Sequence, residues 1–209
     1  MTFESREDAG RQLGQDLAAR QVSADLVLGL PRGGVIVAAE VARVLQCPLD
    51  VLVVRKIGHP LFPEFAVGAL GENGVVVLDK AVLNRARLER AALDETIADE
   101  SRRMHFYQEE FARPDRLSRA GASVIIVDDG LATGATLEAA VLSARKQGVQ
   151  RIVVAVPVAS TRGAARISKI CDEFHSLVID STFQAVGQFY NCFNQTTDEE
   201  VQAILGISS

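Results

Sequence analysis

Residues 124–136 read Val-Ile-Ile-Val-Asp-Asp-Gly-Leu-Ala-Thr-Gly-Ala-Thr, and this stretch decides the fold. Its four apolar residues predict a buried strand that ends at two adjacent carboxylates, Asp128 and Asp129. A turn of small residues then leads into a helical pattern. Ligands of open parallel α/β sheets bind at the carboxyl ends of the strands, so the stretch predicts a binding site as well as a strand-turn-helix unit.

The turn has the chemistry of a phosphate site. Gly134 and the small side chains of Ala132 and Ala135 let backbone N–H groups approach an anion, and the helix N-terminus adds partial positive charge. Thr133 and Thr136 can add hydroxyl donors. The second half of the stretch therefore predicts that a phosphate group binds there.

The two carboxylates need a different partner, because they would repel a phosphate placed directly on them. Sugar hydroxyls or a divalent cation would serve. A phosphorylated sugar satisfies both halves of the loop, with its phosphate at the helix and its diol on Asp128 and Asp129. The alternative is an incidental acid pair, which would leave two carboxylates without a partner at the end of an apolar strand at a considerable energetic cost.

Two other common phosphate loops do not occur in the sequence. No Gly-Lys-Ser/Thr ending is present, and no Gly-x-Gly-x-x-Gly follows a strand pattern. The stretch resembles instead the motif with which type I phosphoribosyltransferases bind 5-phosphoribosyl-1-diphosphate (PRPP), most closely the adenine phosphoribosyltransferase version. This resemblance implies that Asp128 and Asp129 hold the ribose 2′ and 3′ hydroxyls, and that residues 132–136 hold the 5-phosphate.

The rest of the chain alternates short runs rich in valine and isoleucine with helix-like stretches, which is typical of a parallel sheet covered on both faces. The predicted strands are 26–30, 50–55, 75–78, 124–127, 151–156 and 173–179. The predicted helices are 6–20, 35–45, 137–147 and 162–170, the last with Thr161 as its start signal. The fold class is therefore α/β, and the resemblance implies the three-layer type I phosphoribosyltransferase fold.

Two further segments support the predicted site. A Pro-Arg-Gly-Gly turn at residues 31–34 follows the first strand, and the resemblance implies that Arg32 and Gly33 contact pyrophosphate there. Arg55 and Lys56 end the second predicted strand on the same sheet edge, where a cation can neutralise a diphosphate. The resemblance makes Lys56 the pyrophosphate ligand, with a solvated strand end as the alternative.

Two regions interrupt the alternating pattern. Residues 80–119 are crowded with charge and predict one or two exposed helices and a turn at residues 113–115. They form either a solvated insertion or a mobile cover that brings Arg102 or Arg103 over the diphosphate. Residues 180–209 form a small C-terminal hood, and its aromatic residues either wall a planar ligand or pack onto the core; they are Phe183, Phe189, Tyr190 and Phe193.

Composition limits the remaining possibilities. The 209 residues predict a single domain, and the net charge of −5 argues against binding to nucleic acid. The polar N-terminus and the lack of a run of about 18 apolar residues predict a cytoplasmic protein that does not enter a membrane. Three widely spaced cysteines indicate neither a disulfide framework nor a zinc site; they are Cys47, Cys171 and Cys192.

The resemblance implies a magnesium-dependent transfer of the phosphoribosyl group to a nitrogenous base, as in nucleotide salvage, with Asp128, Asp129, Lys56 and Arg32 as catalytic residues. Mg²⁺ would arrive on the diphosphate and contact Asp128 and Asp129. Some purine-type members carry an aspartate where this chain has Ala132, so no general base can be assigned, and Glu64 is a candidate to complete the site. The family also implies a homo-oligomer, with a dimer favoured. The alternatives are a PRPP- or nucleotide-sensing module without transfer activity, and a hydrolase or a transferase for a non-base acceptor.

Overall fold

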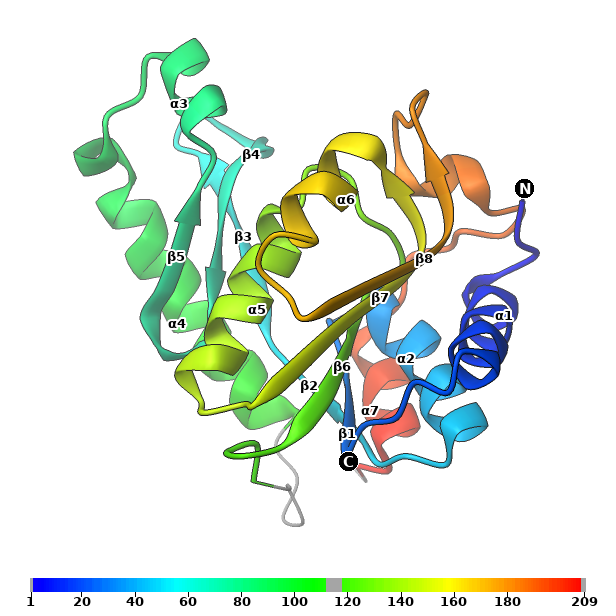
Figure 1. The fold of residues 1–209 in the computed structure, drawn as a ribbon. Coiled ribbons are helices and arrows are strands. Elements are labelled where there is room, and N and C mark those ends of the chain that lie inside the picture. The colour runs from blue at the N-terminus through cyan, green and yellow to red at the C-terminus, as the bar shows by residue number, and fades with distance from the viewer. Residues whose placement is uncertain (1, 112–117, 208–209) are drawn as a thin grey trace.

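The computed structural model describes residues 2–111 and 118–207, which form two sheets and the helices around them (Figure 1). The strands are β1 Leu26–Gly29, β2 Leu49–Val51, β3 Val54–His59, β4 Phe62–Gly71, β5 Val75–Leu78, β6 Ser123–Val127, β7 Arg151–Ser160 and β8 Glu173–Asp180. The α-helices are α1 Arg6–Ala19, α2 Gly33–Leu45, α3 Lys80–Ala86, α4 Asp94–Glu110, α5 Ala135–Lys146, α6 Thr161–Ile167 and α7 Asp198–Leu205. Short 3₁₀ turns occupy Glu72–Gly74, Arg90–Leu93 and Val186–Phe189.

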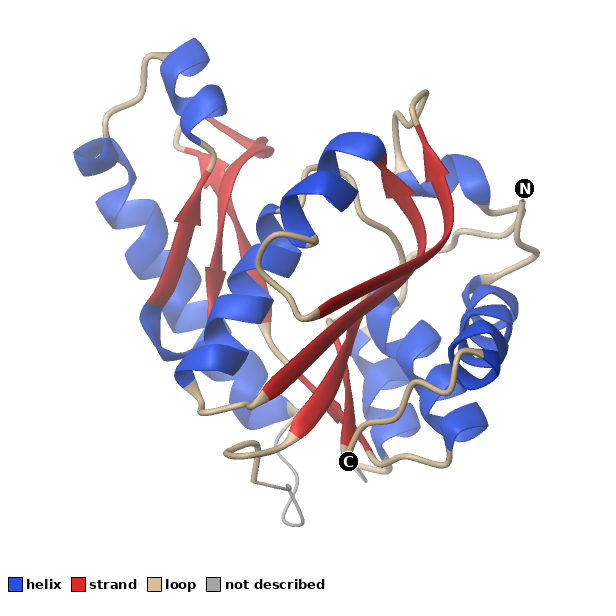
Figure 2. Ribbon diagram, viewed as in Figure 1, coloured by secondary structure: helices blue, strands red, loops and turns tan. Residues whose placement is uncertain are grey.

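The larger sheet is parallel, with strand order β2-β1-β6-β7-β8, and it confirms the predicted α/β class. Successive side chains of a strand point to opposite faces, so each central strand contributes to two layers. Ile126 packs with α5 and α6 on one face, whereas Ile125 packs with α1 and α2 on the other. Figure 2 shows the two helical layers around the red strands. Burial on both faces explains why residues 124–127 of β6 are all apolar.

The smaller sheet is antiparallel, with order β3-β4-β5, and it corrects the predicted strand 50–55. β2 ends at Val51 in the larger sheet, and β3 begins at Val54 in the smaller one. The backbone N–H of Val53 between them donates to the buried Glu72 Oε1 at 3.0 Å. A continuous apolar run does not indicate where the chain leaves one sheet for another. The predicted strand 75–78 also belongs to this sheet, and β4 was not predicted at all.

Helix α5 lies between the two sheets, and α4 covers the outer face of the smaller one (Figure 1). Helices α3 and α4 lie within the 80–119 region, and Met104 of α4 packs with Val67 and Leu70 of the smaller sheet. Arg55 Nε of β3 also pairs with Glu100 Oε2 of α4 at 2.9 Å. The turn predicted at residues 113–115 lies outside the described residues.

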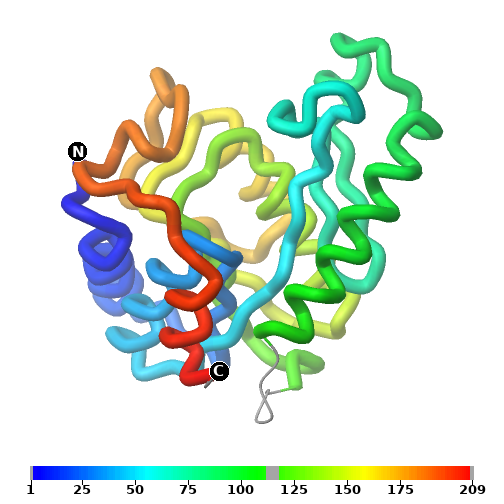
Figure 3. The backbone as a smooth tube through the Cα atoms, turned by 180° about the vertical axis from the view of Figure 1, so that it is seen from behind, coloured from blue at the N-terminus to red at the C-terminus, as the bar shows by residue number. Residues whose placement is uncertain are grey.

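The two ends of the described chain pack together. The N–H of Phe3 donates to the carbonyl of Phe189 at 2.8 Å, and the Phe3 ring lies 5.5 Å from that of Tyr190. Figure 3 shows the orange and red C-terminal segment running over the blue N-terminal elements. The segment ends in α7, which was not predicted and which packs on α2. Within the described ranges, no helix combines the length and the apolar character needed to cross a membrane.

Candidate functional site

The two loops that the sequence singled out lie side by side. Asp128 and Asp129 follow β6, and the loop that follows the neighbouring strand β1 places its glycines against them. A Cβ on Gly33 would lie 2.2 Å from Asp129 Oδ2, and one on Gly34 would lie 2.8 Å from Asp128 Oδ1. Only glycine permits this approach. The peptide bond between Pro31 and Arg32, in the same loop, is cis.

The acidic pair is held in an asymmetric arrangement. Asp129 Oδ2 accepts a hydrogen bond from Arg6 Nε at 2.8 Å, whereas Asp128 Oδ1 accepts one from the Asp129 backbone N–H at 2.9 Å. Burial raises the pKa of Asp128 well above its usual value, and the neighbouring Asp129 charge raises it further. Lys56 and Arg6 act in the opposite direction on this pKa. Asp129 therefore has a cationic partner in direct contact, and Asp128 is the carboxyl of the pair that burial favours in its protonated form.

Lys56 lies near enough to act electrostatically on Asp128, although its strand was assigned to the wrong sheet. It lies on β3, is exposed, and acts electrostatically on Asp128. The smaller sheet thus presents a cation to the carboxyl end of the larger one. From the sequence, Lys56 was placed at this edge as the end of a strand of the larger sheet. In the structure Lys56 lies on β3, which belongs to the smaller sheet.

The predicted phosphate loop is tied to the end of β7. Leu131 N–H donates to the Val158 carbonyl at 2.8 Å, and Ser160 Oγ donates to the Ala132 carbonyl at 2.5 Å. Gly134 has a φ of 87° and is the N-cap of α5, which no side chain caps. The amides of the first turn are therefore available to an anion, beside the exposed Thr133.

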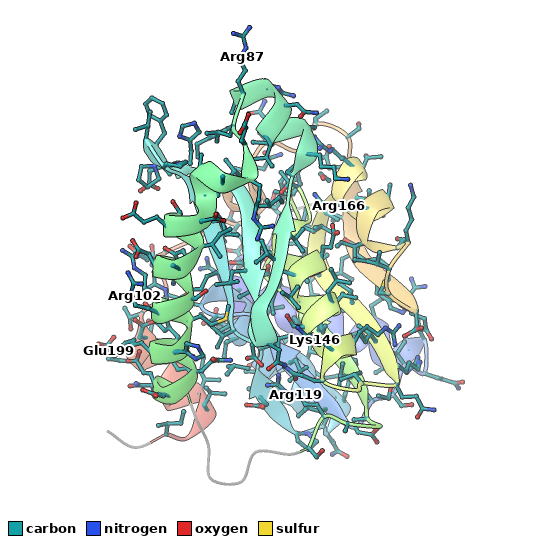
Figure 4. The ribbon with its side chains drawn as sticks, turned by 90° about the vertical axis from the view of Figure 1, so that its left-hand side faces the viewer. Arg87, Arg102, Arg119, Lys146, Arg166 and Glu199 are labelled. Atoms are coloured by element: carbon teal, nitrogen blue, oxygen red, sulfur yellow. The ribbon has the colours of Figure 1, made fainter. Side chains whose placement is uncertain are left out.

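Arg166 of α6 contacts the predicted phosphate loop and the first turn of α5, and this residue was not identified from the sequence. Its Nη1 donates to the Thr133 carbonyl at 3.2 Å, and its Nε pairs with Glu138 of α5. Figure 4 labels Arg166 on the α5 and α6 side of the molecule. Arg166 thereby fixes the loop carbonyl and the first turn of α5 to a second helix.

Arg6, at the start of α1, is a second residue that sequence reasoning missed. Its side chain is only 10% exposed. Besides the contact with Asp129, its Nη1 donates to the Asn194 carbonyl at 2.8 Å, and its guanidinium lies 3.8 Å from the Phe193 ring centroid. An arginine in a polar N-terminal helix gave no signal for these contacts, because its partners lie 123 and 188 residues away.

Of the two roles predicted for the hood aromatics, core packing is the one that three of the four residues follow. Phe189 and Tyr190 are buried in a cluster with Phe3, so they cannot stack on a ligand base, and Phe183 packs on Phe189 at 5.4 Å. Tyr190 Oη donates to the Asp129 carbonyl at 2.6 Å. Burial raises the pKa of Tyr190, and the nearby Asp129 charge adds to the effect. Aromatic packing of the chain end onto the core is the alternative that the structure supports, and it also braces the acidic pair.

A cavity of about 350 Å³ opens beside Asp129 and is lined by Arg6, Arg32, Gly33 and residues 193–196. Phe193 is the hood aromatic that lines it, and 37% of this residue is exposed. Arg32 Nη1 lies 3.8 Å from Asp198 Oδ1, at the start of α7. The predicted pyrophosphate loop and the end of the hood therefore share one cavity.

The other candidates lie apart from these contacts. The guanidinium of Arg102 pairs with Asp99, that of Arg103 pairs with Glu100, and Figure 4 shows Arg102 on the outer side of α4. Glu64 is exposed on β4. In the described part of the chain, no three His, Cys, Asp or Glu side chains gather as a metal site, and the three cysteines are free.

Comparisons with known proteins identify the family of the chain. The sequence matches the phosphoribosyl transferase domain family over residues 6–191. Two curated proteins from strains of Mycobacterium tuberculosis, named only as candidate phosphoribosyl transferases, are each 48% identical over 204 residues. The match covers 97% of this chain and 46% of either relative, so the chain spans about half the length of those proteins.

Solved structures show the same fold. The crystal structure of TT1426 from Thermus thermophilus is 43% identical, has a TM-score of 0.78, and the match covers 98% of each chain. A purine phosphoribosyltransferase from Pyrococcus horikoshii is 17% identical, with a TM-score of 0.50 and coverage of 92% of this chain and 91% of that one. These matches confirm the predicted family and the predicted type I fold.

Proposed function

Because this chain belongs to the phosphoribosyl transferase domain family, we propose that it transfers the 5-phosphoribosyl group of PRPP to a nitrogenous base and releases pyrophosphate. One observation carries the proposal. The uncapped N-terminus of α5, the acidic pair and the Gly33 loop converge at adjacent strand ends of the larger sheet. The helix N-terminus suits the 5-phosphate of PRPP, the acidic pair suits its ribose hydroxyls, and the Gly33 loop suits its diphosphate.

The 5-phosphate would bind to the amides of residues 132–136 and to the hydroxyls of Thr133 and Thr136. The ribose hydroxyls would donate to Asp128 and Asp129, and the diphosphate would bind between the Gly33 loop, Arg32 and Lys56. Arg6 Nε contacts Oδ2 of Asp129, so the second oxygen of this carboxylate would be available for a ribose hydroxyl. Arg32 and Lys56 would supply the positive charge that matches the diphosphate.

In the proposed reaction, a ring nitrogen of the base forms a bond to C1 of the ribose while the bond from C1 to the diphosphate oxygen breaks. The electron pair of that bond leaves with pyrophosphate, and the nitrogen loses its proton. Positive charge would develop on the ribose, and the carboxylate of Asp129 would stabilise that charge. Most of the rate enhancement would come from holding the two reactants in position. None of the contacts described above assigns the proton to a particular base.

Magnesium fits this site as a companion of the diphosphate. One oxygen of Asp129 is engaged by Arg6, and burial raises the pKa of Asp128, so the pair alone is a poor resident site for the ion. Mg²⁺ keeps several waters and prefers substrate phosphates together with one or two carboxylates. When bound, it would neutralise charge on the leaving pyrophosphate. Asp128 and Asp129 are the residues that would hold it, directly or through water.

The test is calorimetry of the full chain with PRPP and Mg²⁺, followed by pyrophosphate release in the same samples across purine and pyrimidine bases. Binding with base-dependent release is the expected result. Binding without release would replace the transferase with the sensing module, and lack of binding would overturn the site assignment. The cytoplasmic location, the role in nucleotide salvage and the homodimer stay predictions.

A further inference from the structure

Two carbonyl groups of the predicted phosphate loop are held by side chains at helix α6. Ser160 Oγ, just before this helix, donates to the Ala132 carbonyl at 2.5 Å, and Arg166 Nη1 donates to the Thr133 carbonyl at 3.2 Å. Gly163 also packs against this side of the loop, because a Cβ there would lie 2.6 Å from the Ala132 carbonyl oxygen. Two consecutive carbonyls of the loop therefore point toward α6.

The direction of these carbonyls sets the direction of the amides that follow them. The peptide bonds of the loop are trans, since the cis bond of the described chain joins Pro31 and Arg32. A trans peptide unit is planar, so its C=O and its N–H point in opposite directions. The N–H groups of Thr133 and Gly134 therefore point away from α6. Neither of them has a recorded hydrogen-bond partner within residues 2–111 and 118–207.

These two amides suit the 5-phosphate of the proposed substrate. Gly134 is the N-cap of α5, with a φ of 87° and no side-chain cap, and successive N–H groups at such a turn form a concave anion site. An N–H that points at a phosphate oxygen makes a charge-assisted hydrogen bond, whereas an N–H that is turned away makes none. The contacts that hold the carbonyls therefore decide how many amides can reach the phosphate.

Two carboxylates keep Arg166 in the orientation that this role requires. Its Nε pairs with Glu138 of α5, and its Nη1 lies 3.6 Å from Asp79 Oδ2. Asp79 is itself fixed, because its Oδ1 accepts from the backbone N–H groups of Ala81 and Val82 at the start of α3. The positive charge of the guanidinium is thus balanced by two acids. Its effect on the loop therefore comes from the hydrogen bond to the loop carbonyl.

We propose that Ser160 and Arg166 are positioning residues for the 5-phosphate of the substrate. By holding two loop carbonyls, they direct the N–H groups of Thr133 and Gly134 toward that phosphate. Ser160 acts on the first of these N–H groups and Arg166 acts on the second. The inference rests on the proposed function and adds two residues that act on the substrate through the backbone of the loop.

Arg166→Met is the first variant, because methionine removes the donor and keeps much of the apolar part of the side chain. Arg162→Met on the same helix is its matched control. Arg162 also pairs with Asp79, at 3.4 Å, but in the described part of the chain it has no recorded contact with the loop. The two variants therefore share the loss of an arginine beside Asp79 and differ in the loss of the loop contact.

Ser160→Ala is the second variant and removes the other donor. Ser160 also caps α6 through the N–H of Gly163, so this change lowers stability as well. Ser168→Ala is its control, because the Ser168 hydroxyl donates to the Ala164 carbonyl at the other end of the helix. Urea denaturation of all four variants sets the temperature at which each of them is folded for the binding experiments.

The first experiment is calorimetry of the full chain and the four variants with ribose 5-phosphate, and separately with pyrophosphate. We expect Arg166→Met and Ser160→Ala each to weaken ribose 5-phosphate binding about tenfold, which corresponds to about one hydrogen bond, with unchanged pyrophosphate affinity. The two controls should match the parent chain for both ligands. An equal loss for both ligands, or equal affinities in each variant and its control, would overturn the inference.

The second experiment assigns each residue to its own amide, by proton–nitrogen NMR spectra with and without saturating ribose 5-phosphate. In the parent chain the amide protons of Thr133 and Gly134 should both move downfield on binding, because they donate to a charged acceptor. Arg166→Met should reduce the change at Gly134, and Ser160→Ala should reduce the change at Thr133. Equal reductions at both amides in both variants would contradict separate positioning and overturn the inference.

Failure of the inference is distinct from failure of the proposed function. If the parent chain binds neither PRPP nor ribose 5-phosphate, the proposed function fails before any variant is compared. If the parent chain binds both ligands and Arg166→Met binds them like Arg162→Met, the proposed function stands and the positioning role of Arg166 is refuted.

Discussion

At the scale of the residue, Arg6 connects three parts of the candidate site. It joins α1, the acidic pair and the hood through an ion pair, a carbonyl contact and a ring contact. Because the guanidinium is planar and carries several donors, it can hold Asp129 and Asn194 simultaneously. Lysine could keep the charge but not this geometry.

Arg6→Met should therefore weaken both folding and binding. It leaves Asp129 largely buried without its cation, and breaking a buried pair from one side costs about 3–5 kcal/mol of unfolding free energy. PRPP affinity should also fall, since Asp129 loses its orientation. Arg11→Met is the control on the same helix, because its ion pair with Asp8 is exposed and worth about 0–1 kcal/mol. Urea denaturation and PRPP calorimetry measure the two effects; equal stability of the two variants would contradict this role of Arg6.

Asp128 should make the protein less stable as the pH rises. Its pKa in the folded chain is raised, chiefly by burial, above the value of about 4 that an unfolded chain shows. Above that lower value the folded state holds a proton that the unfolded state has lost, so the free energy of unfolding falls until the pH passes the folded pKa. Asp128→Asn should remove this part of the pH dependence and be the more stable chain at neutral pH.

The measurement is urea denaturation of both chains between acidic and neutral pH in metal-free buffer. PRPP affinity of Asp128→Asn should fall in the same samples, because an amide is a poorer acceptor for the ribose hydroxyls than a carboxylate. Parallel pH profiles for the two chains would show that burial of Asp128 does not control the stability.

At the scale of the element, the turn from β1 to α2 places its backbone where side chains would otherwise lie. Gly33→Ala would bring a Cβ within 2.2 Å of Asp129 Oδ2 and 2.6 Å of Arg6 Nε, so the acid or the loop must move. We expect PRPP affinity to fall about tenfold or more, as a displacement of a binding group by even 1 Å is costly.

Gly121→Ala separates this effect from simple destabilisation. Gly121 has a φ of 77° with open space around it, so alanine there is strained but touches nothing in the site. Both variants should be less stable than the parent chain, and only Gly33→Ala should lose PRPP affinity in calorimetry. A comparable loss in Gly121→Ala would mean that affinity follows global stability.

Helices and strands could be predicted from the sequence where their residues follow the full pattern of apolar and polar positions expected for that element. β6, the predicted phosphate loop and the start of α5 lie close to their predicted positions, because a buried apolar run and a turn of small residues are visible in the sequence itself. β4 gave no such signal. Its first five residues are exposed and the next five buried, so it has neither the alternation nor the continuous apolar run of a standard strand.

At the scale of the whole molecule, the C-terminal segment connects regions that the sequence keeps far apart. It passes from β8 across the acidic pair, lines the cavity and ends as α7 against α2 and the insertion helix α4. Val201 and Leu205 of α7 are buried in the core that α4 and the smaller sheet share. The hood is therefore held by the same core that positions the smaller sheet. That residues 1–209 form a single domain stays a prediction.

Leu205→Ala should consequently lower the free energy of unfolding by about 2–5 kcal/mol, the usual cost of emptying a buried leucine site. Ile204→Ala on the same helix removes a side chain that is 36% exposed and should cost much less. Urea denaturation of both variants tests this difference. Equal costs would show that α7 does not belong to the cooperative core.

The sequence by itself determined the α/β class, the family and the loop of residues 124–136, because these depend on neighbouring residues and their order along one strand, turn and helix. Tertiary structure alone decided that Arg6 pairs with Asp129, that Lys56 reaches Asp128 from a second sheet, and that Phe189 and Tyr190 are core rather than ligand wall. These contacts join segments more than 60 residues apart. A local sequence pattern predicts whether a side chain is buried. Which residue that side chain contacts depends on how distant parts of the chain pack together.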